Sequence, residues 1–446
     1  MGAREKYRKQ RKFYLDGYAQ YPESFTWHYE MLQAIKNPST ASQTIKFDSA
    51  SQDAFGRLRT SQPFTIFDSN SKYSLNETQW VNSTDGAGSI SFDPITGSET
   101  LSLTGSGKVM SRTNKYIAYQ PGKSLLIMTS FNFGQAAVDI KQQIGYFDLT
   151  DGIYVQLSGN QLSFVKRQKT GVTSSQEFVV NQQDWNIDKL DGTGPSGFTF
   201  DPTKVQIFFT DIEWLGSGAV RMGFVINGNF VLCHTFEHAN VTIGTYMSTG
   251  TLPITYYIES TSGASSDMKK ICSTAISEGG YELLDSKISI HTPIITPITF
   301  GAANIFYPII STRIKVSNLG AVAVLTNISL TGLGTGKYYS WRLTLGESNV
   351  TGGTWSGSGV VEYNTTATSV SGTSKIVASG FTTSSNQGSP VINLDKSSLF
   401  GLQFLVNNSP EFNTESSSEF TLEVAVNNVS GAEGIYGAMD WTEVVH

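Results

Sequence analysis

The chain has 446 residues and a net charge of −6; only 15% of its residues are charged and 12% are aromatic. A disordered chain would be richer in charge and poorer in aromatics, so this composition indicates a folded protein. No run of about 18 apolar residues predicts a transmembrane helix, and the two cysteines are too few for a disulfide framework. The abundance of Gly, Ser, Thr, Val, Ile and aromatic residues predicts an all-β fold.

The first twelve residues carry six basic side chains against one acid, Glu5, whereas the rest of the chain is acidic. A basic arm on an acidic body predicts a docking tail, and the arginines of this segment, Arg4, Arg8 and Arg11, are its candidate contacts. Charge alone fits a solvated basic end equally well. Nucleic acid is not expected as the main ligand, because the acidic body would repel phosphate.

Residues 23–36 are the one segment near the start with a helical pattern. Phe25, Tyr29 and Leu32 fall on one apolar stripe, and Pro38 lies just beyond the end. Such a short helix has no core of its own, so it must pack on the body or on a partner. Extended chain follows, and we predict that residues 1–80 form an anchoring arm with one short helix.

Residues 81–295 read as short strands separated by tight turns. Asp151-Gly152, Gly159-Asn160 and Asn227-Gly228 each lie between two apolar segments. Such dipeptides supply the positive φ that two-residue hairpins need. Turn signals about every ten residues predict a lectin-like antiparallel β-jelly roll.

Pro293 and Pro297 interrupt the pattern in a Thr/Ile-rich stretch that we interpret as a linker. Strand patterns resume after it and continue to the end of the chain. They predict a second, C-terminal β-sandwich over residues 296–446.

Glycoside hydrolysis is the first chemistry to consider, because jelly rolls often host it. One retaining jelly-roll family places three acids at alternate strand positions. Asp211 and Glu213 alternate in this way, but Phe209 stands where the nucleophilic carboxylate is needed. We therefore predict no enzyme activity and no catalytic residues.

A metal site is the second chemistry to consider. His234 and His238 would lie about 13 Å apart on a strand, too far to share one ion. Residues 184–192 contain three aspartates, but their spacing does not match an EF-hand loop and Lys189 opposes a cation. An ordinary turn is the preferred reading of this loop, with a structural cation left open, and we predict neither metal nor cofactor.

Two longer stretches are more specific. Residues 53–68 read DAFGRLRTSQPFTIFD; residues 221–240 begin RMGFVING, and the pattern continues to ICSTAISEGGY at residues 271–281. Both stretches resemble segments of virion structural proteins of tailed bacteriophages, cyanophages especially, with similar proteins in some large DNA viruses. The resemblance covers roughly residues 50–285 and, more loosely, the region around residues 339–343. It implies a class of protein, and no catalytic residues.

The first stretch also has a physical interpretation. Phe55, Phe64 and Phe67 are large apolar anchors in a polar strap, and Arg57 and Arg59 point to one side if the strap is extended. Arginine forks suit carboxylates or carbonyls of another chain. The alternative, equally weighted, is that the strap packs on its own jelly roll and its arginines pair internally.

These observations predict a non-enzymatic virion structural protein, such as a decoration, fibre, tail or baseplate component. Its expected partners are other virion proteins of the capsid, neck or tail and further copies of itself. It would be made in the host cytoplasm and end in the virion. The alternative is an adhesin domain that binds a host surface glycan, for which Trp355 in a Gly/Ser-rich loop is the candidate. A polysaccharide-degrading enzyme ranks third.

Overall fold

The computed structural model describes residues 62–444, apart from residue 78 and the segments 172–173, 282–285, 319–320, 347–349, 371–373, 385–390, 394–405, 409–414 and 431–432. The helix predicted over residues 23–36 lies outside the described residues. Regular structure in the described part is strand, with only short 3₁₀ helices such as η2 (Gln182–Asp184) and η3 (Val316–Asn318). No helix in this part of the chain is long and apolar enough to cross a membrane. The predicted all-β fold is confirmed.

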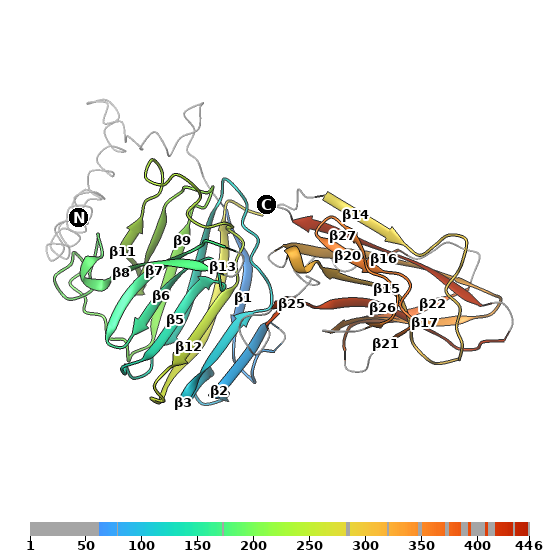
Figure 1. Cartoon of the computed structure of the whole chain (residues 1–446), viewed down its shortest axis with the longest axis horizontal. Helices are drawn as coiled ribbons and strands as arrows, with labels where there is room; N and C mark the ends of the chain where they lie inside the picture. Colours follow the sequence, from blue (N-terminus) through green and yellow to red (C-terminus); the bar gives the residue numbers. More distant parts are fainter. Residues whose placement is uncertain are drawn as a thin grey trace, which may run out of the picture. The chain divides into compact units, whose positions relative to one another are not determined.

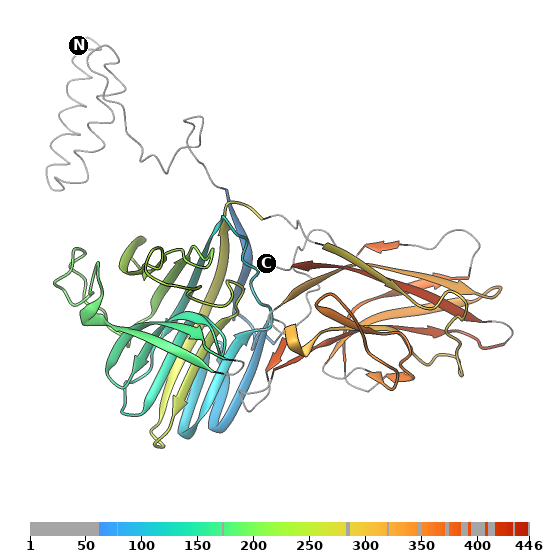
Figure 2. The ribbon, with the colours of Figure 1, turned by 45° about the horizontal axis from the view of Figure 1, so that its top comes forward.

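The first thirteen strands form one antiparallel sheet that curls on itself as a jelly roll (Figures 1 and 2). In chain order they are β1 (Pro63–Asn70), β2 (Trp80–Asp93), β3 (Ser98–Thr113), β4 (Ser124–Asn132), β5 (Ile140–Phe147), β6 (Gly152–Ser158), β7 (Gln161–Lys169), β8 (Ser175–Asn181), β9 (Gln206–Ile212), β10 (Val220–Ile226), β11 (Asn229–Phe236), β12 (Ile254–Ser260) and β13 (Ser266–Glu278). The main path runs β11-β10-β9-β4-β13-β3-β12-β5-β6-β7-β8, with β1 beside β13 and β2 beside β3.

The turn dipeptides identified in the sequence join neighbouring strands of this sheet. Ile226 pairs with Asn229 across the β10–β11 turn, whose two central residues, Asn227 and Gly228, have φ of 51° and 80°. Both values lie in the left-handed region that glycine and asparagine adopt most readily. Gly159-Asn160 likewise lies between the paired Ser158 and Gln161. Gly152, in contrast, is the first residue of β6 and pairs with Phe147, so that turn consists of residues 148–151 and is not the predicted two-residue turn.

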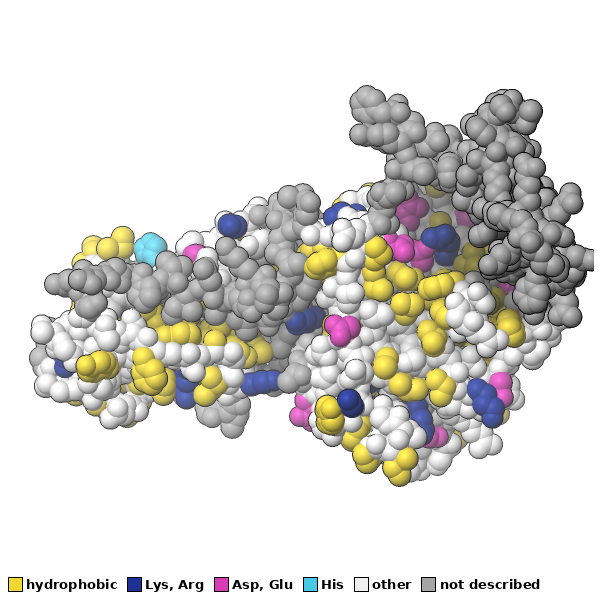
Figure 3. Space-filling view, turned by 180° about the vertical axis from the view of Figure 1, so that it is seen from behind, with side chains coloured by type: hydrophobic (Ala, Val, Ile, Leu, Met, Phe, Trp, Pro, Cys, Tyr) yellow, Lys and Arg dark blue, Asp and Glu magenta, His cyan; other side chains and the backbone are white. Residues whose placement is uncertain are grey.

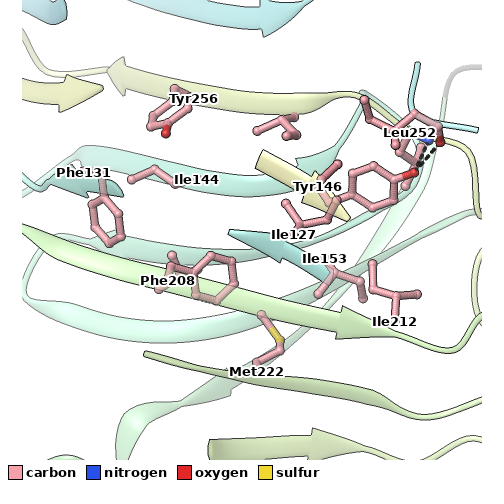
Figure 4. Close-up of a cluster of buried hydrophobic side chains, with 14 of the residues drawn as sticks. Ile127, Phe131, Ile144, Tyr146, Ile153, Phe208, Ile212, Met222, Leu252 and Tyr256 are labelled. Atoms are coloured by element: carbon pink, nitrogen blue, oxygen red, sulfur yellow. Dashed lines mark hydrogen bonds between the residues drawn. The ribbon is translucent and has the colours of Figure 1, made fainter. Parts of the chain in front are cut away.

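The core of the roll lies between the two halves of the curled sheet (Figure 4). Side chains of β4, β9 and β10, such as Ile127, Phe208 and Met222, meet Ile144 of β5 and are fully buried. Tyr146 places its hydroxyl in this core, where it accepts a hydrogen bond from the Leu252 amide at 2.9 Å. A buried hydroxyl needs such partners, because leaving it unpaired would cost more than the hydrogen bond contributes.

Strand β1 lies within the segment predicted as an arm, yet it is part of the large sheet. Its residues pair with β13 from Pro63↔Glu278 to Asn70↔Cys272. Residues 63–70 are thus held by backbone hydrogen bonds to a strand more than 200 residues away in sequence. The jelly roll therefore begins before residue 81.

The remaining strands form a second group of sheets with its own core. They are β14 (Ser286–His291), β15 (Tyr307–Ile314), β16 (Val322–Leu333), β17 (Tyr338–Gly346), β18 (Val350–Thr351), β19 (Ser356–Ser358), β20 (Val361–Asn364), β21 (Ser369–Val370), β22 (Lys375–Thr383), β23 (Val391–Asn393), β24 (Val406–Asn408), β25 (Glu415–Ser417), β26 (Glu419–Val426) and β27 (Gly434–Val444). The two larger sheets have the orders β14-β27-β16-β23 and β19-β20-β15-β26-β17-β22, and β18-β21 and β24-β25 form two separate two-stranded sheets. The facing side chains of the two larger sheets, among them Leu343, Leu422 and Trp441, form a β-sandwich core.

The segment interpreted as a linker contributes to this sandwich. Strand β14 pairs with β27 in register Ile288↔Trp441, and the Thr292 amide donates to the Gly437 carbonyl at 2.9 Å. The sandwich therefore begins before residue 296. Proline is compatible with this arrangement because β14 is an edge strand and ends ahead of Pro293.

Candidate functional site

The docking residues predicted nearest the N-terminus lie outside the described residues. They are Arg4, Arg8, Arg11, Phe25, Tyr29, Leu32, Phe55, Arg57 and Arg59. The structure therefore locates only Phe64, Phe67 and Trp355 among the predicted site residues.

Phe64 and Phe67 both pack on the jelly roll itself. Phe67 is 5% exposed and meets Trp80 edge-on, with ring centroids 6.0 Å apart. Phe64 is stacked with Tyr281 at the same centroid distance. At these two positions the strap anchors the chain to its own sheet.

Of the two acids considered for hydrolysis, Glu213 is exposed just beyond β9, and Asp211 is paired with a neighbouring side chain. Asp211 of β9 is buried and forms an ion pair with Arg221, directly opposite on β10. Burial raises the pKa of the Asp211 carboxyl, and Arg221 opposes that rise. Nearby Glu278 accepts a hydrogen bond from Ser124 at 2.7 Å. Acid catalysis of glycoside cleavage needs a proton donor and a second, free carboxylate, and the Asp211 carboxylate is paired with Arg221.

Phe209 occupies the position where a nucleophile would be needed, and its role is packing. It lies on the face of β9 opposite the core and meets Phe230 edge-on at 5.0 Å between ring centroids. A Cβ at Gly223, its neighbour on β10, would lie 2.9 Å from the Phe209 ring. Glycine at position 223 therefore lets the ring lie flat across β10.

Phe209 belongs to a larger surface that we call the open apolar face. This face is the side of β4, β9, β10 and β11 that points away from the core, and strand pairing places its members next to one another. Ile207 is 40% exposed and Phe230 is 57% exposed, whereas Phe209 between them is 5% exposed. The apolar members of the face are Leu126, Met128, Ile207, Phe209, Val225, Phe230 and Leu232.

Charged side chains border this face on one side. Asp211 and Arg221 lie two residues from Phe209 and Gly223 along the same two strands, on the same face. Figure 3 shows several hydrophobic side chains on one face of the molecule, with polar surface between them and acidic and basic side chains beside some of them. Hydrophobic surface ringed by polar groups is typical of a protein interaction site.

Sequence reasoning missed the open apolar face, although a signal was present. Residues 125–128 read LLIM and residues 207–209 read IFF, so consecutive residues on both faces of β4 and β9 are apolar. A strand that faces water on one side alternates apolar and polar residues, and a continuous apolar run indicates that both faces are covered.

The candidate metal ligands have other partners. The Nδ1 atom of His234 accepts a hydrogen bond from the Asn186 amide, and Nδ1 of His238 lies 2.7 Å from the Gly218 carbonyl oxygen. Asp188 accepts bonds from the Leu190 and Ser196 amides, one on each carboxylate oxygen. The described residues contain no group of three or more His, Cys, Asp or Glu side chains that could hold a metal ion.

Trp355 is half-buried in the C-terminal sandwich. The guanidinium of Arg313 lies over its ring at 3.9 Å from the centroid. Arg313 also forms ion pairs with Glu362 at 2.5 Å and with Glu419 at 3.0 Å. One face of the indole is therefore covered, and only the opposite face is left for a ligand.

Comparison of the chain with protein-family models and with curated proteins gave no match. Solved structures similar to the chain include the β-glucanase of Bacillus licheniformis, which is 14% identical with a TM-score of 0.31 and covers 50% of this chain and 100% of its own. A carbohydrate esterase from a Shiga toxin-encoding bacteriophage is 12% identical over 49% of this chain and 100% of its own, with a TM-score of 0.30. The CBM2 module of an evolved Dit protein from Lactobacillus casei phage J-1 is 8% identical over 50% of this chain and 100% of its own, with a TM-score of 0.33. At such identities the likeness concerns the fold alone.

Proposed function

We propose that this protein is a non-enzymatic structural component of a virus particle, attached through its N-terminal arm and packed against other virion proteins. The observation that carries the proposal is the open apolar face. Phe230 and Ile207 are 57% and 40% exposed on it. Burying such a face against a neighbour removes apolar area from water at about 25 cal/mol per Å².

The state of the acidic residues supports the non-enzymatic part of the proposal. Asp211 is neutralised by Arg221, and Phe209 packs on Phe230 where a nucleophile would be required. The phage-like stretches at residues 53–68 and 271–281 are the reason for proposing a virion rather than another assembly.

Deleting residues 1–45 is expected to abolish entry of the protein into particles while the rest of the chain stays folded. The deletion removes the basic segment and the apolar stripe but leaves every strand of the described part intact. Infected cells would be complemented with the truncated and full-length chains, and purified particles would be probed by immunoblot. Normal incorporation of the truncation would refute attachment through the arm.

Phe230→Asp is expected to lower incorporation at least about tenfold, because a charge in a buried apolar contact is not compensated. The side chain is largely exposed in the free protein, so the free energy of unfolding should change by no more than about 1 kcal/mol. Ile95→Asp is the matched control, since Ile95 is 93% exposed in the β2–β3 turn, away from the open apolar face. Equal incorporation of both variants would exclude the face as a contact.

Recognition of a host glycan is the second candidate. It depends on Trp355, which has one ring face covered by Arg313 at 3.9 Å. Sugar rings stack on open aromatic faces, so this site would offer a single platform. We place it second for that reason.

A further inference from the structure

Strand β8 is an open edge of the large sheet. It lies at one end of the strand order and pairs with β7, and no described strand pairs with its outer side. Phe178 and Val179 are 37% and 48% exposed. Edge strands of this kind present a row of backbone N–H and C=O groups that can template pairing with another chain.

The other outer strands of this sheet contain register shifts that interrupt such pairing, and β8 contains none. Register shifts occur in β1 between Thr65 and Phe67, in β2 between Gly86 and Gly88, and in the β10–β11 pair at Met222/Gly223. The β7–β8 register is continuous from Ser163↔Asn181 to Lys169↔Ser175. Bulges twist an edge and disrupt its ladder, so β8 is the outer strand of this sheet best shaped for extension.

The β8 edge also carries no unbalanced charge. Its sequence, SQEFVVN, has no proline and one charged residue, Glu177. Glu177 accepts bonds from Arg167 at 2.8 Å and from the Tyr154 hydroxyl at 2.7 Å, both on strands inside the sheet. Lys166 of β7 is largely buried and lies over the Phe178 ring at 4.4 Å. Lysines and other charges at edges normally prevent edge-to-edge contact, and none projects from the outer side of β8.

We propose that β8 pairs antiparallel with β8 of a second copy of this chain, so that two jelly rolls share one continuous sheet across a two-fold axis. Two identical strands that pair antiparallel form a self-complementary contact, which is the requirement of an isologous dimer. A neutral edge can approach its own copy without like-charge repulsion, and the Phe178 and Val179 side chains would gain cross-strand neighbours. The proposed partner is thus a second copy of the same chain. The proposal rests on the structural role proposed above in one respect: that role brings many copies close together.

Cysteine cross-linking of the full-length chain tests the contact. Phe178→Cys, in a Cys272→Ser background that removes the exposed native cysteine, should form a disulfide-linked dimer under mild oxidation. Val205→Cys is the control, because Val205 is 60% exposed but lies outside β8. A cross-linked yield at position 178 no higher than at position 205 would overturn the proposal.

Val179→Glu provides the second measurement. With Phe178 opposite its own copy, position 179 lies opposite Glu177 of the second copy, so the introduced carboxylates should raise the dimer dissociation constant at least about tenfold in sedimentation velocity, and thermal unfolding would verify the fold. A wild-type chain that stays monomeric, or a variant that associates like the wild type, would also overturn the pairing. Either result would leave the incorporation assay to decide the structural role, so the two proposals fail separately.

Discussion

Glu99→Gln is expected to lower the free energy of unfolding by about 3–5 kcal/mol, because it leaves the buried Lys270 ammonium without a counter-ion. Glu99 and Lys270 face each other across β3 and β13 with 2.7 Å between Oε2 and Nζ, and their side chains are 0% and 2% exposed. The Trp80 ring lies 3.7 Å from the ammonium. Burial lowers the pKa of Lys270 to about 8 even with Glu99 opposing the change.

Further hydrogen bonds connect the Glu99–Lys270 pair to other segments of the chain. The ammonium donates to Ser111 at 2.8 Å, and Glu99 accepts from the Ser71 hydroxyl at 2.6 Å. Combining Glu99→Gln with Lys270→Met should recover most of the loss, because the double variant no longer buries an unpaired charge.

A matched control exists on the same strand. Glu259 and Lys108 are also directly opposed, across β12 and β3, at 3.5 Å with 21% and 39% exposure. Glu259→Gln should cost less than about 1 kcal/mol, as is usual for exposed pairs. Urea unfolding of the three variants measures the difference. Equal losses for Glu99→Gln and Glu259→Gln would contradict the predicted role of burial.

Acidification from pH 6.5 toward pH 4 is expected to destabilise the fold through His234. Burial lowers the pKa of this imidazole from 6.5 to about 4. Its Nδ1 accepts the Asn186 amide proton at 3.3 Å, which requires the neutral ring. The unfolded chain binds the proton in this window and the folded protein does not, so each pH unit favours unfolding by up to about 1.4 kcal/mol.

His234→Gln should reduce the number of protons taken up on unfolding by about one between pH 6.5 and 4, so the free energy of unfolding should depend less on pH. Carboxylates also titrate in this range, and the difference between variant and wild type removes their contribution. His291→Gln is the control, because His291 lies exposed at the end of β14. If the free energy of unfolding of His234→Gln depends on pH as steeply as that of the wild type, other groups must cause the dependence.

The local sequence specified much of this fold. Asn227-Gly228 closes the β10–β11 hairpin as predicted, because turn geometry depends on the two residues in the turn. Strand β27 carries the buried Trp441 near the end of the chain. Its pairing with β14 and β16 joins segments more than 100 residues apart, which no local pattern encodes.

The candidate site was specified only in part. The phenylalanine at position 209 showed from the sequence that the nucleophile of the hydrolase pattern is absent there. The structure shows that this side chain packs on Phe230. The open apolar face and the unprotected β8 edge depend on which strands become neighbours and which become outermost. Neither property belongs to a single strand.

Composition and turn residues by themselves determined an all-β protein, because low charge, β-branched residues and tight turns favour strands wherever they pair. The tertiary structure alone decided that residues 63–70 join the jelly roll, through the β1–β13 register. It also decided that Glu99 meets Lys270 in the core. Both contacts are long-range, and a strand's sequence sets its propensity and its faces but not its partner.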